Sequence, residues 1–160
     1  MSNLTFVRSV TVARSVKDTF AYVSDFNRAY EWRDEVKASR ATPSGPMRVG
    51  TQLHEESVLA GRPVVTESVV DGYEAPYRWS FAHLSGPMPV SGEYVVAPVD
   101  GGARCTYTLR VRLQGGWALL APLFRLTGGR TMERSLAKFA ENLHAGPGAH
   151  AGSGAPTDDH

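Results

Sequence analysis

The chain of 160 residues has a single cysteine, no long apolar run and almost no net charge. One thiol, Cys105, cannot form an internal disulfide, and the polar start MSNLTFVRSV lacks the apolar core of a signal peptide. Both features favour a cytoplasmic protein. The longest apolar stretch, residues 117–124, is far shorter than the roughly 20 residues that a membrane-spanning helix needs. We therefore expect no membrane insertion.

Positive and negative side chains are nearly balanced, with 17 Lys and Arg against 16 Asp and Glu. Without an excess of charge, the protein is not expected to bind nucleic acid or an anionic surface. The sequence also lacks a glycine-rich phosphate loop, zinc-ligand spacing, a nucleophile elbow and a dinucleotide-binding fingerprint. We therefore predict no metal and no other cofactor.

Alternation of apolar and polar residues predicts an antiparallel sheet. In the clearest run, residues 103–113, one face is apolar and the other carries Arg and Thr. This period of two is typical of a strand with one buried face. The turn signal Asp100-Gly101-Gly102 pairs the run with a partner strand at 90–98. Similar patterns predict further strands at residues 5–13, 35–41, 51–59, 63–71 and 77–84.

Helical patterns occur only near the two ends of the chain. Ser15 and Asp18 have the spacing of a capping box, which predicts a short helix at 16–24, and a further turn or two fits 26–31. Residues 117–144 are predicted to form a long amphipathic helix. The apolar stripe in the second half of this helix consists of Met132, Leu136, Phe139 and Leu143.

Glycine and proline shape the C-terminal part of the chain. Pro122 and the pair Gly128-Gly129 are expected to weaken or kink the first half of the long helix. From Ala145 onward the chain is small, polar and rich in Gly and Pro, so it cannot bury enough apolar surface to fold. The length suits one domain. We therefore predict a single domain at 1–144 and a disordered tail at 145–160.

This order of elements predicts an α+β fold in which the sheet curls around the final helix. The chain resembles the polyketide cyclase/dehydrase and lipid transport (SRPBCC) family of the START-like superfamily, which has the helix-grip fold of the birch pollen allergen. The resemblance implies about seven antiparallel strands wrapped around a long C-terminal helix, with two short helices after the first strand. It covers roughly residues 5–144 and rests on the ordered segments ARSVKDTFAYVSDFNRAYEW, GPMRVGTQLHEESVLAGR, VVDGYEAPYRWSF, YVVAPVDGGARCTYTLRV and LLAPLF.

The resemblance also implies a class of function. Members of this family hold a deep cavity between sheet and helix for lipids, sterols, polyketides or plant hormones, and only some of them are enzymes. The preferred interpretation is a carrier or sensor of a hydrophobic or amphipathic small molecule, without chemistry of its own, acting as a monomer or weak homodimer. One alternative is a polyketide cyclase or dehydratase that uses inward-facing His, Tyr or Glu as acid and base. Another is a module whose concave sheet grips a protein partner.

The inner face of the predicted sheet mixes Trp, Tyr and His with aliphatic residues. The polar tips of these side chains need partners when buried, so the mixture suits a mostly apolar pocket with a few polar groups. The same pattern also fits an ordinary core. The candidate ligand-binding residues are Trp79, Phe81, His83, Tyr94, Val96, Tyr107, Leu109, Leu120, Phe124, Leu136 and Phe139.

The most polar stretch within a predicted strand is HEES, residues 54–57. His54 and Glu56 share one face and Glu55 and Ser57 share the other, and the pattern does not decide which face points inward. A histidine and a carboxylate two residues apart could bind a metal or act as an acid and base pair. No third ligand is evident, so a solvated face is the preferred interpretation.

His83 is the candidate catalytic residue. An imidazole that faces a cavity could remove a proton next to a ketone, although a histidine that caps the sheet or contacts water has the same pattern. Binding and catalysis would be told apart by whether His83, Glu55 or Glu67 reaches the cavity with a polar partner. A cavity lined only by apolar groups and tyrosine hydroxyls would favour binding.

Overall fold

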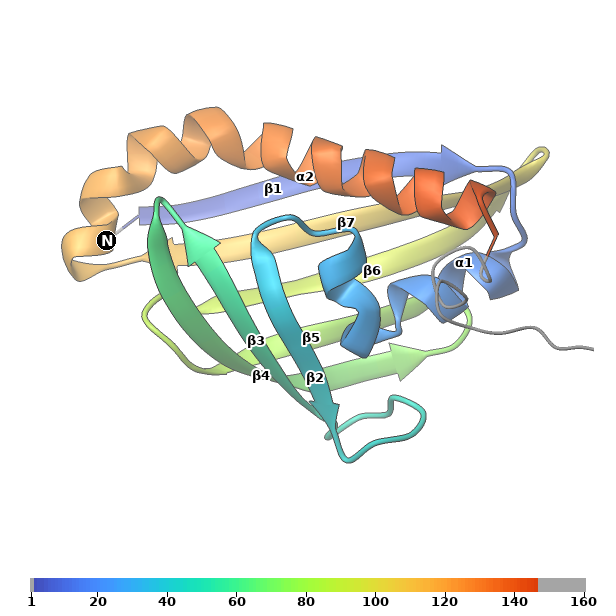
Figure 1. The fold of residues 1–160 in the computed structure, drawn as a ribbon, viewed down its shortest axis with the longest axis horizontal. Helices are drawn as coiled ribbons and strands as arrows, with labels where there is room; N and C mark the ends of the chain where they lie inside the picture. Colours follow the sequence, from blue (N-terminus) through green and yellow to red (C-terminus); the bar gives the residue numbers. More distant parts are fainter. Residues whose placement is uncertain (1, 147–160) are drawn as a thin grey trace, which may run out of the picture.

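Seven antiparallel strands form one curled sheet in the computed structural model of the chain, which describes residues 2–146 (Figure 1). The order across the sheet is β1-β7-β6-β5-β4-β3-β2, so β1 and β2 lie at opposite edges. The predicted α+β helix-grip fold, with two short helices after the first strand and a long C-terminal helix, is confirmed. The strands are β1 (Ser2–Val12), β2 (Val36–Thr42), β3 (Gln52–Leu59), β4 (Arg62–Glu74), β5 (Arg78–Ser85), β6 (Val90–Val99) and β7 (Gly102–Leu113).

Each predicted strand is present, and the differences lie at the strand ends. β1 is longer than predicted because it pairs with β7 along its whole length, from Ser2 opposite Leu113 to Val12 opposite Ala103. β4 continues beyond the predicted 63–71 to Glu74, which pairs with β5 after an irregularity in the ladder. Partner strands therefore extend both elements past the point where the local pattern ends.

Two short helices connect β1 to β2 across the sheet. α1 (Val16–Val23) begins at the predicted cap, where the backbone N–H of Asp18 donates to Ser15 Oγ at 3.0 Å. The 3-10 helix η1 (Phe26–Glu31) follows. α1 is held against the sheet because the indole Nε1–H of Trp79, on β5, donates to the carbonyl of Val23 at 3.1 Å.

The C-terminal helix differs from its prediction at the start. Residues predicted as its first turn form a separate 3-10 helix, η2 (Gly115–Leu120), and α2 runs without interruption as Ala121–His144. Pro122 lies in the first turn, where a missing N–H costs no hydrogen bond. Gly128 allows β1 to approach closely, since a Cβ there would lie 2.6 Å from the ring of Phe6.

The two halves of α2 have different surroundings. Figure 1 shows the helix lying along β1 while the sheet curls round toward β2. In the second half, Phe139 is fully buried, with its ring 5.1 Å from the rings of both Tyr22 and Trp32. Leu136 and Leu143 join the same apolar core. The first half borders an open space between the helix and the sheet, and its start packs into a second, smaller apolar cluster with Leu4, Met88 and Leu113.

The described part of the chain ends just after α2. Ala145 caps α2, and the predicted tail, 145–160, lies outside the described residues from position 147 onward. None of the helices within residues 2–146 combines the length and apolar character needed to cross a membrane.

Candidate ligand-binding cavity

A cavity of about 500 Å³ lies between the sheet and the first half of α2. Its wall is mostly apolar, and a volume of this size is typical of a site for a small organic molecule. The main apolar and aromatic side chains in the wall are Leu4, Phe6, Leu53, Trp79, Phe81, Tyr94, Tyr107, Leu109, Val111, Leu123, Phe124 and Met132.

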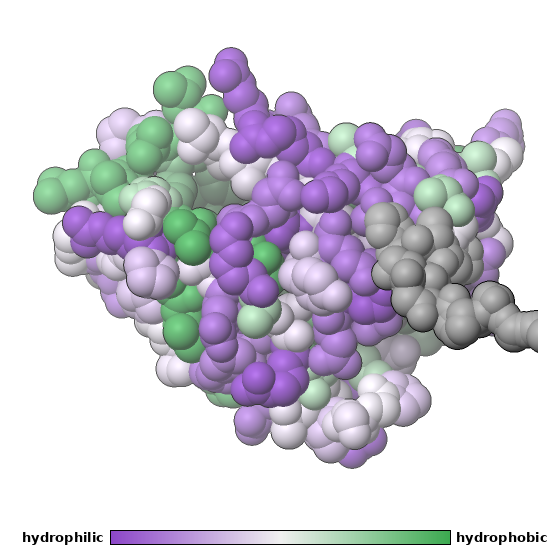
Figure 2. Space-filling view, viewed as in Figure 1, coloured by the Kyte–Doolittle hydropathy of each residue, from purple (hydrophilic) through white to green (hydrophobic). Residues whose placement is uncertain are grey.

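Exposed leucines lie beside this cavity, on η2 and the first turns of α2. Leu119 is 83% exposed and Leu126 is 69% exposed, and Leu123 both lines the cavity and reaches the surface. Figure 2 shows apolar residues gathered around a hollow on this part of the molecule. The apolar wall of the cavity therefore continues onto the surface.

The structure divides the predicted ligand-binding residues into two groups. One group lines the cavity: Trp79, Phe81, Tyr94, Tyr107, Leu109 and Phe124. Val96, Leu136 and Phe139 pack in the core without lining the cavity, and Leu120, at the end of η2, is not part of the cavity wall either. That the first group contacts a ligand stays a prediction.

His83 is not one of the residues that line the cavity. It lies on β5 opposite Ser68 of β4, and its buried Nδ1 has no hydrogen-bond partner within the described part of the chain. Burial lowers the pKa of His83. The thiol of Cys105 is also buried, which raises its pKa to about 12, so no thiolate nucleophile is present near neutral pH.

The two faces of HEES are assigned by the pairing of β3. His54 points away from the cavity and contacts Glu67 of β4 through Nδ1 and Glu56 through Nε2, which lies 2.9 Å from the carboxylate. These hydrogen bonds, first that to Glu56 and then that to Glu67, raise the pKa of His54. Glu55 and Ser57 lie in the cavity wall. The prediction of a solvated face therefore holds for Glu56, whose side chain is 52% exposed, and is wrong for Glu55.

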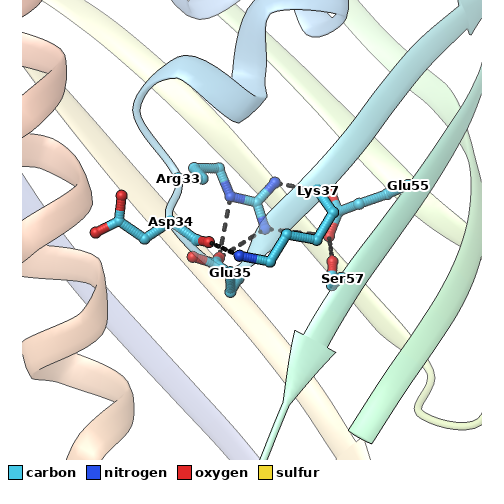
Figure 3. Close-up of polar contacts among 6 residues, drawn as sticks. All are labelled: Arg33, Asp34, Glu35, Lys37, Glu55 and Ser57. Atoms are coloured by element: carbon cyan, nitrogen blue, oxygen red, sulfur yellow. Dashed lines mark hydrogen bonds and ion pairs between the residues drawn. The ribbon is translucent and has the colours of Figure 1, made fainter. Parts of the chain in front are cut away.

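Glu55 belongs to a group of largely buried polar side chains, three of them charged (Figure 3). We call it the Arg33 cluster; it consists of Arg33, Glu35, Glu55 and Ser57. Arg33 Nη1 donates to Glu55 Oε1 at 2.8 Å, and Nη2 donates to Oε2 at 3.3 Å. Arg33 Nε and Nη2 donate to Glu35 Oε2 at 3.2 and 3.1 Å. Ser57 Oγ donates to Glu55 Oε2 at 2.8 Å. The side chains of Arg33, Glu35 and Glu55 are only 12%, 18% and 19% exposed.

Arg33 remains charged in this setting. Burial opposes its charge, but the nearby carboxylates, Glu55 ahead of Glu35, outweigh burial and raise the pKa of Arg33 well above its ordinary value. The cluster thus holds one guanidinium between two carboxylates. Charge-assisted hydrogen bonds of this length are among the strong ones in proteins, and here they hold the guanidinium to both carboxylates.

Two tyrosines lie in the cavity wall near the Arg33 cluster. The rings of Tyr94 and Tyr107 stack with centroids 4.3 Å apart, and Tyr94 also stacks on Trp79 at 5.0 Å. Burial raises the pKa of both tyrosines above the ordinary value. Their hydroxyls therefore stay protonated near neutral pH and can donate or accept a hydrogen bond.

Exposed charges also lie in the cavity wall, at its rim. These are Asp34, Lys37 and Arg134. Asp34 points toward α2 in Figure 3, and its Oδ1 lies 3.0 Å from Nζ of Lys138 on that helix. This ion pair connects the segment before β2 to α2 beside the cavity.

No sequence pattern marked Arg33 or Glu35 as site residues. Both fall in the short connection between η1 and β2, where no periodic pattern marks a face. The one available signal was their position just after Trp32, a large aromatic residue. In the structure Trp32 is 2% exposed. Within residues 2–146, no three His, Cys, Asp or Glu side chains are arranged to hold a metal ion.

A sheet curled around a C-terminal helix, with a cavity between them, defines a START-like protein of the helix-grip fold. The sequence profile described as polyketide cyclase / dehydrase and lipid transport matches residues 3–145. The chain therefore belongs to that family. Among curated proteins, none has a sequence that matches this chain significantly.

Solved structures share this fold at low sequence identity. The protein TTHA0849 from Thermus thermophilus is 17% identical, with a TM-score of 0.77 over 90% of this chain and 99% of that one. A START superfamily protein from Mycobacterium smegmatis is 16% identical, with a TM-score of 0.74 over 88% and 97%. The ZhuI aromatase/cyclase from Streptomyces sp. R1128 is 15% identical, with a TM-score of 0.72 over 96% and 99%. At these identities the likeness establishes the fold alone.

Proposed function

We propose that the chain binds a hydrophobic or amphipathic small molecule in the cavity between the sheet and α2. The observation that carries the proposal is the mostly apolar cavity of about 500 Å³. Protein interiors are close-packed, so a void of this size is not an ordinary packing defect. The description of the family, which includes lipid transport, supports the same function. In this proposal the protein acts in the cytoplasm, as a monomer or weak homodimer.

Filling the cavity is expected to abolish binding without unfolding the protein. Thr131 lines the cavity from α2, so the indole in Thr131→Trp would occupy space that the ligand needs. Titration of the neutral dye Nile red, followed by its fluorescence, should show affinity at least about tenfold weaker than for the wild type. Ala137→Trp adds the same ring at an exposed position of the same helix and should leave the affinity unchanged.

Equal affinities in the wild type and both variants would place the dye outside the cavity and contradict the proposal. So would a wild-type protein that binds no dye and, in native mass spectrometry after purification, carries no apolar molecule. A retained molecule, released by denaturing extraction, would identify the natural ligand class directly.

A second candidate function is that of a polyketide cyclase or dehydratase. The Arg33 cluster favours it, because Glu55 reaches the cavity wall with a polar partner and lies near tyrosine hydroxyls that stay protonated. A carboxylate can remove a proton next to a ketone while a hydroxyl donates to the carbonyl oxygen. ZhuI, which shares the fold, is an aromatase/cyclase.

The two functions differ in whether a bound ketone exchanges its α-hydrogens. If the protein is an enzyme of this kind, a long-chain methyl ketone deuterated next to its carbonyl should lose deuterium to water faster with the protein than in buffer. Glu55→Gln should slow this exchange by about 10²–10⁴-fold, as followed by NMR. Binding of the ketone with no acceleration of exchange would leave the carrier as the function.

A further inference from the structure

We infer that the cavity selects apolar molecules whose polar end donates hydrogen bonds, a hydroxyl or an amine, over molecules that end in a carboxylate. This inference rests on the proposed function, because it names the ligand class of the same cavity. It follows from three properties of the Arg33 cluster: four of the five N–H donors of Arg33 are occupied, the buried charge is negative, and one acceptor is unpaired within the described part of the chain.

Arginine is the residue that would ordinarily hold a ligand carboxylate, through two parallel N–H donors. In this cavity Arg33 already uses Nε, Nη1 and Nη2 in hydrogen bonds to Glu35 and Glu55. A ligand carboxylate would have to displace one of these partners and leave it buried without its cation. Removing one partner from a buried ion pair is strongly unfavourable. With a single Nη1 hydrogen left, Arg33 cannot hold a carboxylate through two parallel donors unless it gives up Glu35 or Glu55.

The charges of the cavity wall also disfavour a ligand carboxylate. The buried charged residues are one arginine and two glutamates, which in their ordinary charge states sum to one negative charge. The remaining charged residues of the wall, Asp34, Lys37 and Arg134, are exposed, so water and salt screen them. An anionic group inside the cavity would meet net repulsion, whereas a neutral or cationic donor would not.

The Arg33 cluster also contains a hydrogen-bond acceptor that lacks a partner within the described residues. Glu35 Oε1 is buried and has no hydrogen-bond partner among residues 2–146, while Oε2 accepts two hydrogen bonds from Arg33. A carboxylate oxygen gains from each hydrogen bond it accepts, and a buried one without a partner is costly. Glu35 is part of the cavity wall, so a ligand hydroxyl or amine that reaches its carboxylate supplies the missing donor. The tyrosine hydroxyls accept or donate equally well and do not oppose this preference.

Three probes with the same ten-carbon body test the inference: 1-decanol, decylamine and decanoate. Displacement of Nile red near neutral pH should give decanol and decylamine affinities at least about tenfold tighter than that of decanoate. In Glu35→Gln, which removes one buried negative charge and keeps the shape, decanoate should bind several-fold more tightly than to the wild type. Glu55→Gln should shift the preference in the same direction.

Lys37→Gln is the matched control, because a decanoate that bound tail-first would place its carboxylate at the rim near Lys37. A wild-type protein that binds decanoate as tightly as decanol would overturn the inference. So would a preference that changes in Lys37→Gln and not in Glu35→Gln. In both cases the probes still bind, so the proposed function stands. If none of the three displaces the dye and Thr131→Trp has no effect, the proposed function fails as well.

Discussion

Arg33→Met is expected to lower the free energy of unfolding by about 3–5 kcal/mol. Arg33 is 12% exposed and is the shared partner of Glu35 and Glu55. The variant keeps a side chain of similar length but leaves two buried carboxylates without their cation. Urea unfolding near pH 7, followed by tryptophan fluorescence, measures the loss.

The dependence on pH identifies the cause of this loss. A buried carboxylate without a partner takes up a proton more readily in the folded state than in the unfolded state, so the variant should lose stability as pH rises. Its deficit relative to the wild type should therefore be smaller near pH 5 than near pH 8. The triple variant Arg33→Met, Glu35→Leu, Glu55→Leu removes every charge and should recover most of the stability. A deficit below about 1 kcal/mol, or one independent of pH, would contradict this account.

Phe139→Ala is expected to cost about 3–5 kcal/mol. The ring is fully buried between Tyr22 of α1 and Trp32 after η1, with centroids 5.1 Å from each. Its removal leaves a space that two rigid aromatic rings cannot easily fill. Equilibrium unfolding in urea gives the free energy change.

Leu126→Ala is the matched control on the same helix. Leu126 is 69% exposed, so its truncation should change the free energy of unfolding by no more than about 0.5 kcal/mol. Similar losses in both variants would mean that the second half of α2 is not the packed half. The comparison therefore tests whether Phe139 anchors the second half of α2 in the core.

Much of the fold follows from local patterns. The alternation in 103–113 and the turn before it correctly predict β7 and its pairing with β6, because each inward apolar residue must bury its side chain on one face. The cap at Ser15 correctly predicts the start of α1, since the unpaired N–H groups of a helix end need an acceptor. The break between η2 and α2 was not predictable, because apolar residues continue through it and only packing ends one helix and begins the next.

The candidate site was predictable only in part. The period of two shows that Trp79, Tyr94 and Tyr107 point to the same side, and the structure places all three in the cavity wall. The apolar stripe of the long helix placed Phe139 opposite them, but Phe139 packs in the core without lining the cavity. Whether an inward residue packs or borders a cavity depends on the distance between the helix and the sheet, which no local pattern contains.

The sequence by itself determined most of the elements, the hairpin pairing of β6 with β7 and the apolar face of most strands, because each depends on residues close together in the chain. Only the tertiary structure decided which face of HEES is buried, since both faces of that stretch are polar and the register with β2 and β4 selects between them. It also decided the partner of Glu55. Arg33 lies 22 residues earlier, and their ion pair forms because β2 pairs with β3, which places the segment just before β2 beside Glu55.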